Sequence, residues 1–540
     1  MKITNGNLNF KMMKSYFTFI LIFFAILFIQ NHTSANEPEE IVLTWQDDTK
    51  TSMTITWRTE EPNAKTYGMN KIEKAEEQAA GQIEFTEIRE ELLENGWQDA
   101  GYDSPEEAFA HLAAGVMNYT ERDADFAYRI LMNNWSTYTD EVGLEEELLP
   151  DRIDWNEIVN TGAENILYYT EKSDDEADIG DYHTVEPETY TFAETAAWLH
   201  RVKLTDLEPG MTYEVILERD GQQADSFNFR TAPADKREIT FIAGADTQSE
   251  TPERKEMTEL AATFDPEFVM IAGDIVMNGM AESEWDQWFK EWHELMITDE
   301  GRRVPVVPAL GNHDVRGWIM GDFETDAAFY ANRFNLPDPR RFYALEYGPG
   351  LALITLDTGH TSAFNEELNW FEDTGYYEGE NHRVRDSHTG EQRDWLEQTL
   401  AEYQDSPWIM GHYHVNAFAT SPHYWEKPRY GRPLMHEHWI PLFEEYEVDL
   451  IHEGHGHRMK RTHPIRDMEI DEDGVVYIGE GGWGTHMGEP EDMWFVDDKG
   501  SDHHFWKLTL EEGWETLKGV PVKWIDGEAV KGQEFTIEQR

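Results

Sequence analysis

Five short motifs in the second half of the chain each carry a side chain that can bind a metal ion. In chain order they are Asp246-Thr247-Gln248, Gly273-Asp274, Gly311-Asn312-His313-Asp314, Gly411-His412 and Gly454-His455-Gly456-His457. Carboxylate, carboxamide and imidazole groups together suit divalent or mixed-valence first-row metals, and the absence of cysteine excludes a thiolate site. A single Asp or His is usually a surface or core residue, whereas this ordered set is difficult to assemble by accident. The motifs therefore predict a metal centre.

Such a donor set suits two metal ions that share one carboxylate. Two ions about 3.5–4 Å apart hold a shared hydroxide as a nucleophile and stabilise both the attacked and the departing side of a phosphate ester. Asp274 is the natural bridge in this set. Alone, Asp274 is better explained as a turn residue and Asn312 as a helix cap. The other motifs reverse that preference and favour hydrolysis of phosphate esters at a two-metal centre.

Short buried strands must position these motifs. The apolar runs at 239–243 and 268–272 are continuous, as in strands buried on both faces, and a helix is predicted between them over about 252–263. Asp246 and Asp274 follow these runs, so we expect them just past the carboxyl ends of neighbouring strands, where open α/β sheets bind ligands. Similar runs at 304–310, 408–410 and 448–451 are predicted to bring Asn312, His412, His455 and His457 to the same rim.

From Glu238 to about Leu510 the chain resembles a calcineurin-like metallophosphoesterase, and most closely the purple acid phosphatase branch of that family. The five metal motifs carry the resemblance together with the segments 341–343, 354–358, 392–396 and 443–449. The resemblance implies a four-layer α/β fold in which β sheets are flanked by helices. It also implies a metal-dependent phosphoric ester hydrolase.

The same resemblance implies how the ligands are shared. One metal ion takes Asp246, Gln248, Asp274 and His457, and the second takes Asp274, Asn312, His412 and His455. His313 is implied to contact the substrate phosphate or to protonate the leaving oxygen, with Asp314 as its orienting partner. The role of His414 stays open between a substrate-facing imidazole and a group that supports a ligand.

Two positions depart from the purple acid phosphatase pattern. Met277 stands three residues after Asp274, where that branch has a Tyr ligand, and Gln248 stands where many relatives have His. Because the tyrosine phenolate gives the ferric ion its colour, these changes predict a colourless centre containing Mn, Zn or Fe. They also weaken the expectation of an acid pH optimum.

The region before the motifs has the alternation typical of β strands. Strands are predicted at 41–45, 53–57, 165–170, 198–204, 213–217 and 226–231. The segment 207–213 resembles the turn and corner tyrosine of fibronectin type III modules, in which the tyrosine hydroxyl ties a loop to a strand. Purple acid phosphatases also carry a fibronectin-like domain ahead of the catalytic one. We therefore predict an all-β sandwich over 36–235 and a catalytic domain over 236–540.

Two further segments are predicted to stand apart from these domains. Lys11 and Lys14 precede an uncharged apolar run over 15–29, and residues 33–35 are small, which predicts a cleavable secretory signal peptide over 1–35. The run is shorter than the roughly 20 residues of a spanning helix, so a retained membrane anchor is disfavoured. Residues of about 61–161 are predicted to form an acidic, largely helical insertion, with a partly disordered excursion as the alternative.

The formal charge of -64 comes from 108 acidic and 44 basic side chains. Such an excess argues against binding of nucleic acid or of an anionic membrane, and it repels a phosphate substrate at low salt. In molar salt the Debye length falls to about 3 Å, which removes this penalty. We therefore expect a secreted or periplasmic protein adapted to high salt. The alternative is an acidic secreted protein with one cationic metal pocket.

Hydrolysis of phosphate monoesters is the leading functional hypothesis, with a small phosphorylated molecule as the substrate. A phosphodiesterase or nucleotide hydrolase is the alternative, because the loops that close over the centre decide the substrate and their shape cannot be interpreted from the sequence. A non-catalytic secreted binding protein is a second alternative. That reading requires a degraded centre, and every motif retains a competent ligand.

Overall fold

The computed structural model describes residues 38–59, 165–173, 181–190, 192, 195, 197–219, 221–249, 251–315, 323–358, 390–421 and 432–540. The predicted signal peptide (1–35) and the insertion predicted over about 61–161 lie outside the described residues. Within the described part of the chain, no helix is long and apolar enough to cross a membrane.

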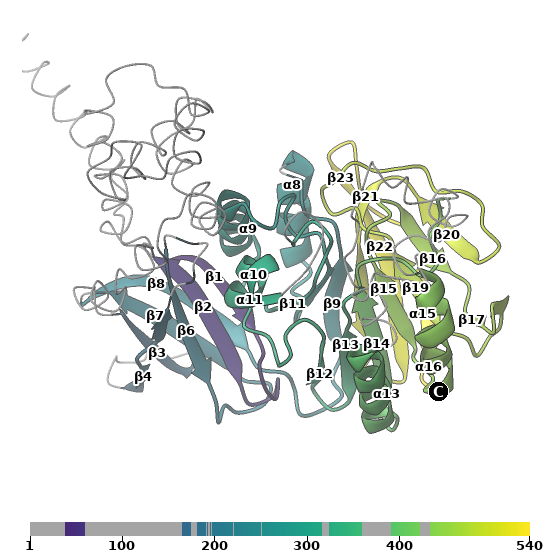
Figure 1. Ribbon diagram of the computed structural model, residues 1–540. Helices are drawn as coiled ribbons and strands as arrows, with labels where there is room; N and C mark the ends of the chain where they lie inside the picture. The colour runs from purple at the N-terminus through teal and green to yellow at the C-terminus, as the bar shows by residue number, and fades with distance from the viewer. Residues whose placement is uncertain are drawn as a thin grey trace, which may run out of the picture.

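A seven-stranded sheet carries the first three metal motifs. Its order is β11-β10-β9-β21-β22-β23, with β24 beside β22 (Figure 1). The strands are β9 (Ile239–Gly244), β10 (Val269–Ala272), β11 (Val306–Ala309), β21 (His503–Leu510), β22 (Thr516–Ile525), β23 (Glu528–Lys531) and β24 (Phe535–Glu538). β10 pairs in parallel with both β9 and β11, so the carboxyl ends of these three strands lie along one edge. The predicted pairing of the first two apolar runs is confirmed.

A second seven-stranded sheet, in the order β12-β13-β14-β15-β19-β16-β20, carries the last two motifs. The strands are β12 (Tyr343–Tyr347), β13 (Leu351–Thr355), β14 (Trp408–Tyr413), β15 (Leu450–Glu453), β16 (Met459–Thr462), β19 (Val476–Gly479) and β20 (Val496–Gly500). β13, β14, β15 and β19 are parallel, which again collects their carboxyl ends at one edge. A short ribbon of β17 (Ile465–Arg466) and β18 (Glu469–Ile470) lies beyond β16.

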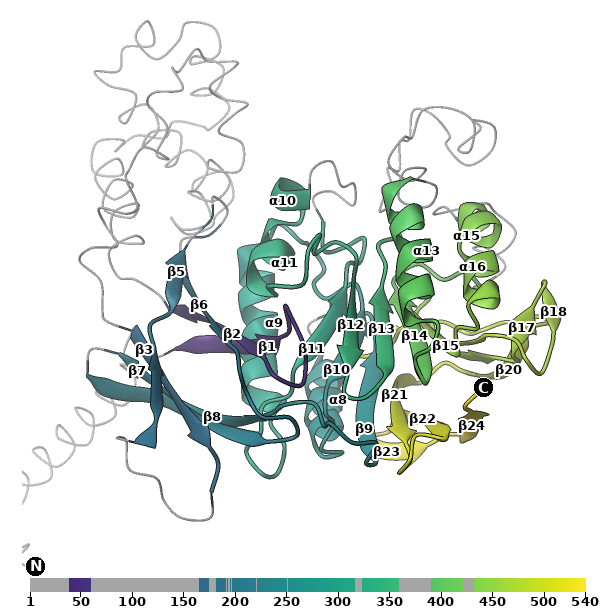
Figure 2. The same cartoon turned by 90° about the horizontal axis from the view of Figure 1, so that it is seen from below.

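The two sheets share one core, and helices cover the outer face of the second sheet (Figure 2). The helices are α8 (Pro252–Ala262), α9 (Glu282–Leu295), α10 (Phe323–Asp326), α11 (Ala328–Arg333), α13 (Glu391–Tyr403), α15 (Arg432–His438) and α16 (Ile440–Glu445). α8 and α9 lie on the side of the first sheet, and α13, α15 and α16 on that of the second. Trp408 and Met410 of β14 belong to the core between the sheets, whereas Ile409 and Tyr413 pack with residues of these helices. The predicted four-layer α/β fold is confirmed.

The N-terminal described segments form two four-stranded antiparallel sheets, with the orders β1-β2-β6-β5 and β4-β3-β7-β8. The strands are β1 (Glu39–Thr44), β2 (Met53–Thr59), β3 (Asn165–Glu171), β4 (His183–Val185), β5 (Glu188–Tyr190), β6 (Trp198–Leu204), β7 (Thr212–Arg219) and β8 (Gln222–Arg230). The Tyr213 hydroxyl accepts a hydrogen bond from the Glu208 backbone N–H at 2.8 Å, which is the predicted tie between loop and strand. The β character of this region is confirmed, and the fibronectin type III assignment stays a prediction.

Apolar packing and a buried ion pair join the β region to the α/β region. Trp45 makes edge contacts with Phe268 and Tyr347, at ring-centroid distances of 6.4 and 5.8 Å. The buried Glu40 carboxylate is paired with the Arg333 guanidinium. A single hydrophobic cluster runs through both regions. The β region therefore packs directly against the α/β region and shares its hydrophobic core.

Candidate metal centre

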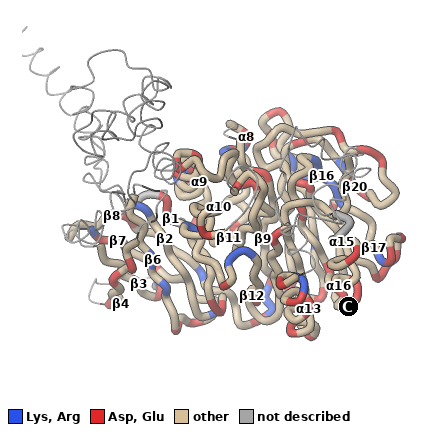
Figure 3. Tube along the Cα trace, viewed as in Figure 1, with Lys and Arg blue, Asp and Glu red and all other residues tan. Residues whose placement is uncertain are grey.

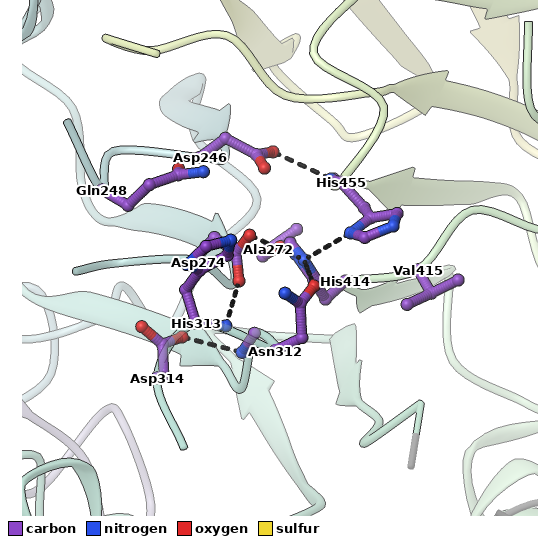
Figure 4. Close-up of polar contacts among 12 residues, drawn as sticks. Asp246, Gln248, Ala272, Asp274, Asn312, His313, Asp314, His414, Val415 and His455 are labelled. Atoms are coloured by element: carbon purple, nitrogen blue, oxygen red, sulfur yellow. Dashed lines mark hydrogen bonds and ion pairs between the residues drawn. The ribbon is translucent and has the colours of Figure 1, made fainter. Parts of the chain in front are cut away.

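Asp274 lies at the centre of the candidate metal ligands (Figure 4). Two groups of side chains each have donor atoms within 4.8 Å of one another, and Asp274 belongs to both groups. We call the group completed by Asp246 and His457 the Asp246 side, and the group completed by His414 and His455 the His414 side. The carboxylate predicted as the bridge therefore stands between two clusters of potential ligands.

On the Asp246 side, Oδ1 of the buried Asp246 carboxylate lies 3.1 Å from His457 Nε2. With its amide oriented to satisfy both neighbours, Gln248 donates to the backbone carbonyls of Asp246 and Asp274 and presents its Oε1 3.3 Å from His457 Nε2. Burial opposes protonation of His457, but the hydrogen bond to Asp246 raises its pKa. A buried carboxylate oxygen, an amide oxygen and an imidazole nitrogen thus converge, which fits a divalent metal ion.

On the His414 side, the buried His414 ring is in contact with three other potential ligands. Its Nε2 lies 3.1 Å from Asp274 Oδ2 and 3.0 Å from Asn312 Oδ1. The same atom lies 3.2 Å from His455 Nδ1. His414 Nδ1 donates to the Ala272 carbonyl at 2.8 Å, which fixes the ring and turns Nε2 toward the other donors. Burial opposes the charged ring, but Asp274 raises the pKa of His414 to about 9. A metal ion bound here would displace that proton.

His412 lies outside both groups, which corrects its predicted role as a ligand. β14 extends three residues beyond the apolar run that predicted it, because His412 pairs with Thr355 of β13 and with His452 of β15. The buried His412 ring places Nε2 2.6 Å from the Thr355 hydroxyl, and burial lowers its pKa to about 3. His414 is the first residue past the strand, and it occupies the position predicted for His412.

Asp314 is likewise not the orienting partner of His313 that the sequence predicted. Its buried carboxylate accepts hydrogen bonds from the backbone N–H groups of Gly311, Ile275 and Val276 at 2.7, 2.8 and 3.1 Å. Burial and the nearby Asp274 carboxylate raise the pKa of Asp314 to about 7. Because both of its oxygens are occupied by main-chain donors, Asp314 fixes the two loops that carry Asp274 and Asn312 against each other.

The His313 ring is held by a main-chain carbonyl beside the centre. Its Nδ1 donates to the Met277 carbonyl at 2.8 Å, and its backbone N–H donates to Asp274 Oδ1 at 2.8 Å. Because a carbonyl can only accept, Nδ1 is the protonated nitrogen. Met277, which stands where a Tyr ligand was expected, has a side chain that is 42% exposed. Its contribution here comes from its main chain.

The loops that carry the ligands have unusual backbone conformations. Asp246, Asp274, His455 and His457 all have positive φ angles, between 52° and 68°. Such conformations are uncommon for residues with a side chain, cost on the order of 1–3 kcal/mol each and cluster at functional sites. At Gly311 a Cβ would lie 1.9 Å from the backbone nitrogen of Asp274, so this position accepts no side chain. The strain and the close approach both point to a functional centre.

A buried ion network lies behind the Asp246 side. The Lys460 ammonium contacts Glu453 Oε2 and lies 3.6 Å from Glu480 Oε1, and all three side chains have no exposed surface. The Glu480 carbonyl accepts a hydrogen bond from the His457 N–H at 2.8 Å, so the network fixes the loop that presents His457. The sequence gives no signal for these three residues, because charged side chains in strands usually face solvent.

Comparisons with known sequences relate part of this chain to phosphoesterases. Residues 239–459 match the family described as calcineurin-like phosphoesterase. An uncharacterized protein of Mycobacterium tuberculosis is 25% identical over 342 residues, which cover 58% of this chain and 60% of that protein. Purple acid phosphatase 23 of Arabidopsis thaliana is 24% identical over 349 residues, covering 58% of this chain and 68% of that protein. Probable inactive purple acid phosphatase 24 of the same plant is 26% identical over 242 residues, covering 41% and 35%.

Solved structures agree on the fold. A purple acid phosphatase, PPD1, from yellow lupin (Lupinus luteus) seeds has a TM-score of 0.58 and 17% identity, covering 93% of this chain and 74% of that chain. PhoD has a TM-score of 0.54 and 12% identity, covering 94% of this chain and 91% of that chain. At these identities the likeness establishes the α/β metallophosphoesterase fold and leaves the substrate to be argued from the site itself.

Proposed function

We propose that this chain, whose residues 239–459 match the calcineurin-like phosphoesterase family, hydrolyses phosphate monoesters at a two-metal centre. The observation that carries the proposal is the place of Asp274, whose carboxylate belongs to both groups of candidate ligands. A carboxylate shared in this way is what a pair of ions requires in order to lie close enough to act on one phosphoryl group.

The proposed ligands combine the sequence prediction with the geometry. One ion is held by Asp246, Gln248, Asp274 and His457, and the other by Asp274, Asn312, His414 and His455. When bound, ions of Mn, Zn or Fe supply Lewis-acid activation of a water molecule and of the phosphoryl oxygens. The absence of cysteine favours this range of hard and borderline metals over thiophilic ones.

His313 is the proposed group that acts on the substrate rather than on a metal ion. Hydrolysis breaks a phosphorus–oxygen bond, and the departing oxygen needs a proton. His313 is held beside Asp274 by two main-chain hydrogen bonds, with Nδ1 engaged by a carbonyl. Its Nε2 is therefore the atom that donates a proton to the leaving oxygen or a hydrogen bond to the phosphate.

A comparison of a monoester with a diester tests the proposal most directly. Protein reconstituted with Mn, Zn or Fe is assayed against p-nitrophenyl phosphate and bis(p-nitrophenyl) phosphate. We expect the monoester to be hydrolysed with the higher kcat/KM. The opposite preference would favour a phosphodiesterase or nucleotide hydrolase. Hydrolysis of neither by protein that holds two ions would favour the non-catalytic alternative, which the name of one relative, probable inactive purple acid phosphatase 24, keeps open.

The metal assignment carries its own measurement. Since Met277 replaces the Tyr of the purple branch, we propose that the active protein lacks an intense visible charge-transfer band. An absorption spectrum of active protein with a known metal content checks this directly. A purple preparation would mean that another tyrosine binds iron and that the ligand set is wrong.

We also propose that the mature protein works outside the cytoplasm in high salt, without a retained membrane anchor. The support is the apolar run over 15–29 and the formal charge of -64. Acidic residues are spread along the whole of the described trace (Figure 3). Because unscreened like charges destabilise the compact state, the melting temperature should rise from low salt to molar NaCl. A flat or falling curve would reject the adaptation to salt.

A further inference from the structure

One wall of the centre is made by residues 480–488, which we call the glycine loop. The backbone N–H groups of Gly482 and Trp483 both donate to the Ala245 carbonyl, at 3.1 and 3.0 Å. At the far end, the Gly488 N–H donates to the His457 carbonyl at 2.8 Å. The loop is therefore attached to the strand end that precedes Asp246 and to the loop that presents His457.

The glycine loop touches the metal ligands so closely that one position excludes any side chain. A Cβ on Gly481, whose φ is +92°, would lie 1.7 Å from Asp246 Oδ2. The Gly484 carbonyl accepts a hydrogen bond from the Thr251 hydroxyl at 2.8 Å, and Thr485 is buried. A residue that projects from this loop is thus held at a fixed distance from the centre.

His486 is that residue, and its imidazole is exposed beside a proposed metal ligand. The His486 and His457 ring centroids are 4.8 Å apart, with an angle of 89° between the ring planes. The side chain is exposed, and its ring nitrogens make no hydrogen bond to the described residues. His486 is not itself in either group of candidate ligands. It therefore lies one ring farther from the centre than His457, where it faces solvent and not an ion.

The Arg458 guanidinium supplies a permanent positive charge beside the glycine loop in an otherwise strongly acidic chain, and a Cβ on Gly488 would lie 2.8 Å from its Nη2. The Arg458 guanidinium lies along the end of the glycine loop, where its Nε donates to the Glu489 carbonyl at 3.0 Å. The positive charge of Arg458 would attract an anionic group that arrives at this point.

We propose that His486 and Arg458 form a subsite for a second anionic group of the substrate, next to the phosphoryl group that is hydrolysed. This inference rests on the proposed function and narrows its substrate class to compounds with two adjacent phosphoryl groups, such as a nucleoside diphosphate. Water adds to the terminal phosphorus, the bond to the bridging oxygen breaks, and inorganic phosphate and the nucleoside monophosphate leave with release of a proton.

The positions of His313 and His486 assign them to different parts of the substrate. His313 lies on the His414 side, where it contacts Asp274, while His486 lies beyond His457 on the Asp246 side. A monoester with a neutral leaving group places no charge near His486. A diphosphate places its second phosphoryl group there, and hydrogen bonds between a charged group and a fixed donor are among the stronger ones in proteins.

The test compares His486→Ala with wild type in the metal-loaded full chain. Substrates are ADP and p-nitrophenyl phosphate, both with metal ions in excess. We expect kcat/KM for ADP to fall by about 10-fold or more, chiefly through KM, while that for p-nitrophenyl phosphate stays within about twofold. His463→Ala is the matched control, because His463 is also partly exposed and is paired with Asp497. Arg458 is left intact, because it also bonds the Gly456 carbonyl.

A binding measurement keeps the inference separate from the proposed function. Titration calorimetry on the metal-loaded protein should show that His486→Ala weakens pyrophosphate and leaves inorganic phosphate unchanged. Metal content, measured in parallel, should equal that of wild type. Equal losses for both anions or both substrates, no loss for either, or loss of a metal ion would overturn the subsite. If wild type hydrolyses neither substrate, the proposed function fails, and the difference between pyrophosphate and phosphate binding decides the subsite.

Discussion

The Asp246 side and the His414 side of the centre use similar ligands but are held by different physical means. On the His414 side the supports are main-chain atoms: the Ala272 carbonyl fixes His414, and three backbone N–H groups fix Asp314. On the Asp246 side, main-chain hydrogen bonds of the glycine loop are joined by a set of buried charges around Lys460. Main-chain supports survive most substitutions, whereas a buried ion network depends on each of its members. The Asp246 side should therefore be the more fragile half.

Asp274 belongs to both sides, so its removal is the largest perturbation. Asp274→Asn removes the charge that holds two cations together, and we expect metal content and hydrolysis to fall jointly. Elemental analysis and an assay of the same preparation check this, with the retained fold confirmed by circular dichroism. An Asp274→Asn variant with two bound ions and full activity would show that Asp274 is not the bridging ligand.

The second largest effect distinguishes His414 from His412. His414→Ala should empty the position shared with Asn312 and His455, with a large loss of activity for every substrate. His412→Ala should keep both ions, because its Nε2 bonds Thr355 inside the sheet. Metal stoichiometry of the two variants measures the difference. Loss of an ion from His412→Ala alone would restore the prediction made from the sequence.

The difference between His412 and His414 shows that an apolar run in the sequence does not fix the last residue of a strand. The apolar runs before Asp246 and Asp274 end near the ends of β9 and β10, so the motifs were placed correctly. The run at 408–410 ends three residues before β14 does, because pairing with β13 and β15 continues the strand. Residues two apart also share a face in a strand, so alternation does not distinguish His412 from His414. The end of β14, and therefore which histidine lies past it, is determined by pairing with β13 and β15.

The residues that support the candidate ligands were not predicted from the sequence. Asp314 is adjacent to His313 in sequence, which suggested that its carboxylate orients the His313 ring. In the structure, that carboxylate instead accepts hydrogen bonds from three backbone N–H groups. Lys460, Glu453 and Glu480 meet only because β15, β16 and β19 come together in the folded sheet. Contacts of this kind carry no local signal. Metal ligands, in contrast, are restricted to a few residue types and follow strand ends.

His313 sharpens the comparison, because it lies on the His414 side without being a proposed ligand. His313→Ala should retain both ions and lose about 10² to 10⁴ in rate, the usual worth of a general acid or a transition-state donor. The loss should be smaller for p-nitrophenyl phosphate than for an alkyl phosphate, since nitrophenolate departs with little protonation. Equal losses for both esters would leave phosphate binding as its role, and loss of metal would contradict the assignment.

Lys460→Met tests the claim that the Asp246 side depends on buried charge. Removing the ammonium leaves Glu453 and Glu480 without their cation, which should cost about 3–5 kcal/mol of stability. We expect a lower melting temperature and weaker binding of one ion, with the His414 side still occupied. The double variant Lys460→Met/Glu453→Gln should recover part of the stability, because it removes the uncompensated charge. Unchanged metal affinity in Lys460→Met would show that the two sides are equally robust.

The smallest effect concerns acid stability, where the two sides should behave alike. His412 lies behind the His414 side, and His504 bonds the glycine loop through its backbone N–H to the Gly482 carbonyl at 3.2 Å. Burial lowers the pKa of each to about 3, below the ordinary value of 6.5. Between pH 6.5 and 3, these two histidines therefore bind protons in the unfolded chain but stay neutral in the folded chain. The stability that each neutral ring contributes is present above pH 6.5 and is lost as the pH falls toward 3.

Each histidine should account for a loss of about 1.4 kcal/mol between pH 7.5 and 5.5. Urea unfolding of the metal-free protein at these two pH values measures the slope, and His504→Asn should reduce it by that amount. The metal-free form is used because ion binding is itself coupled to protonation. If His504→Asn leaves the slope unchanged, the imidazole is protonated in the folded chain and burial is not holding it neutral. If His504→Asn reduces the slope, the protein is most stable above pH 6.5. That result would be a second reason, independent of Met277, to expect that the pH optimum of activity is not acidic.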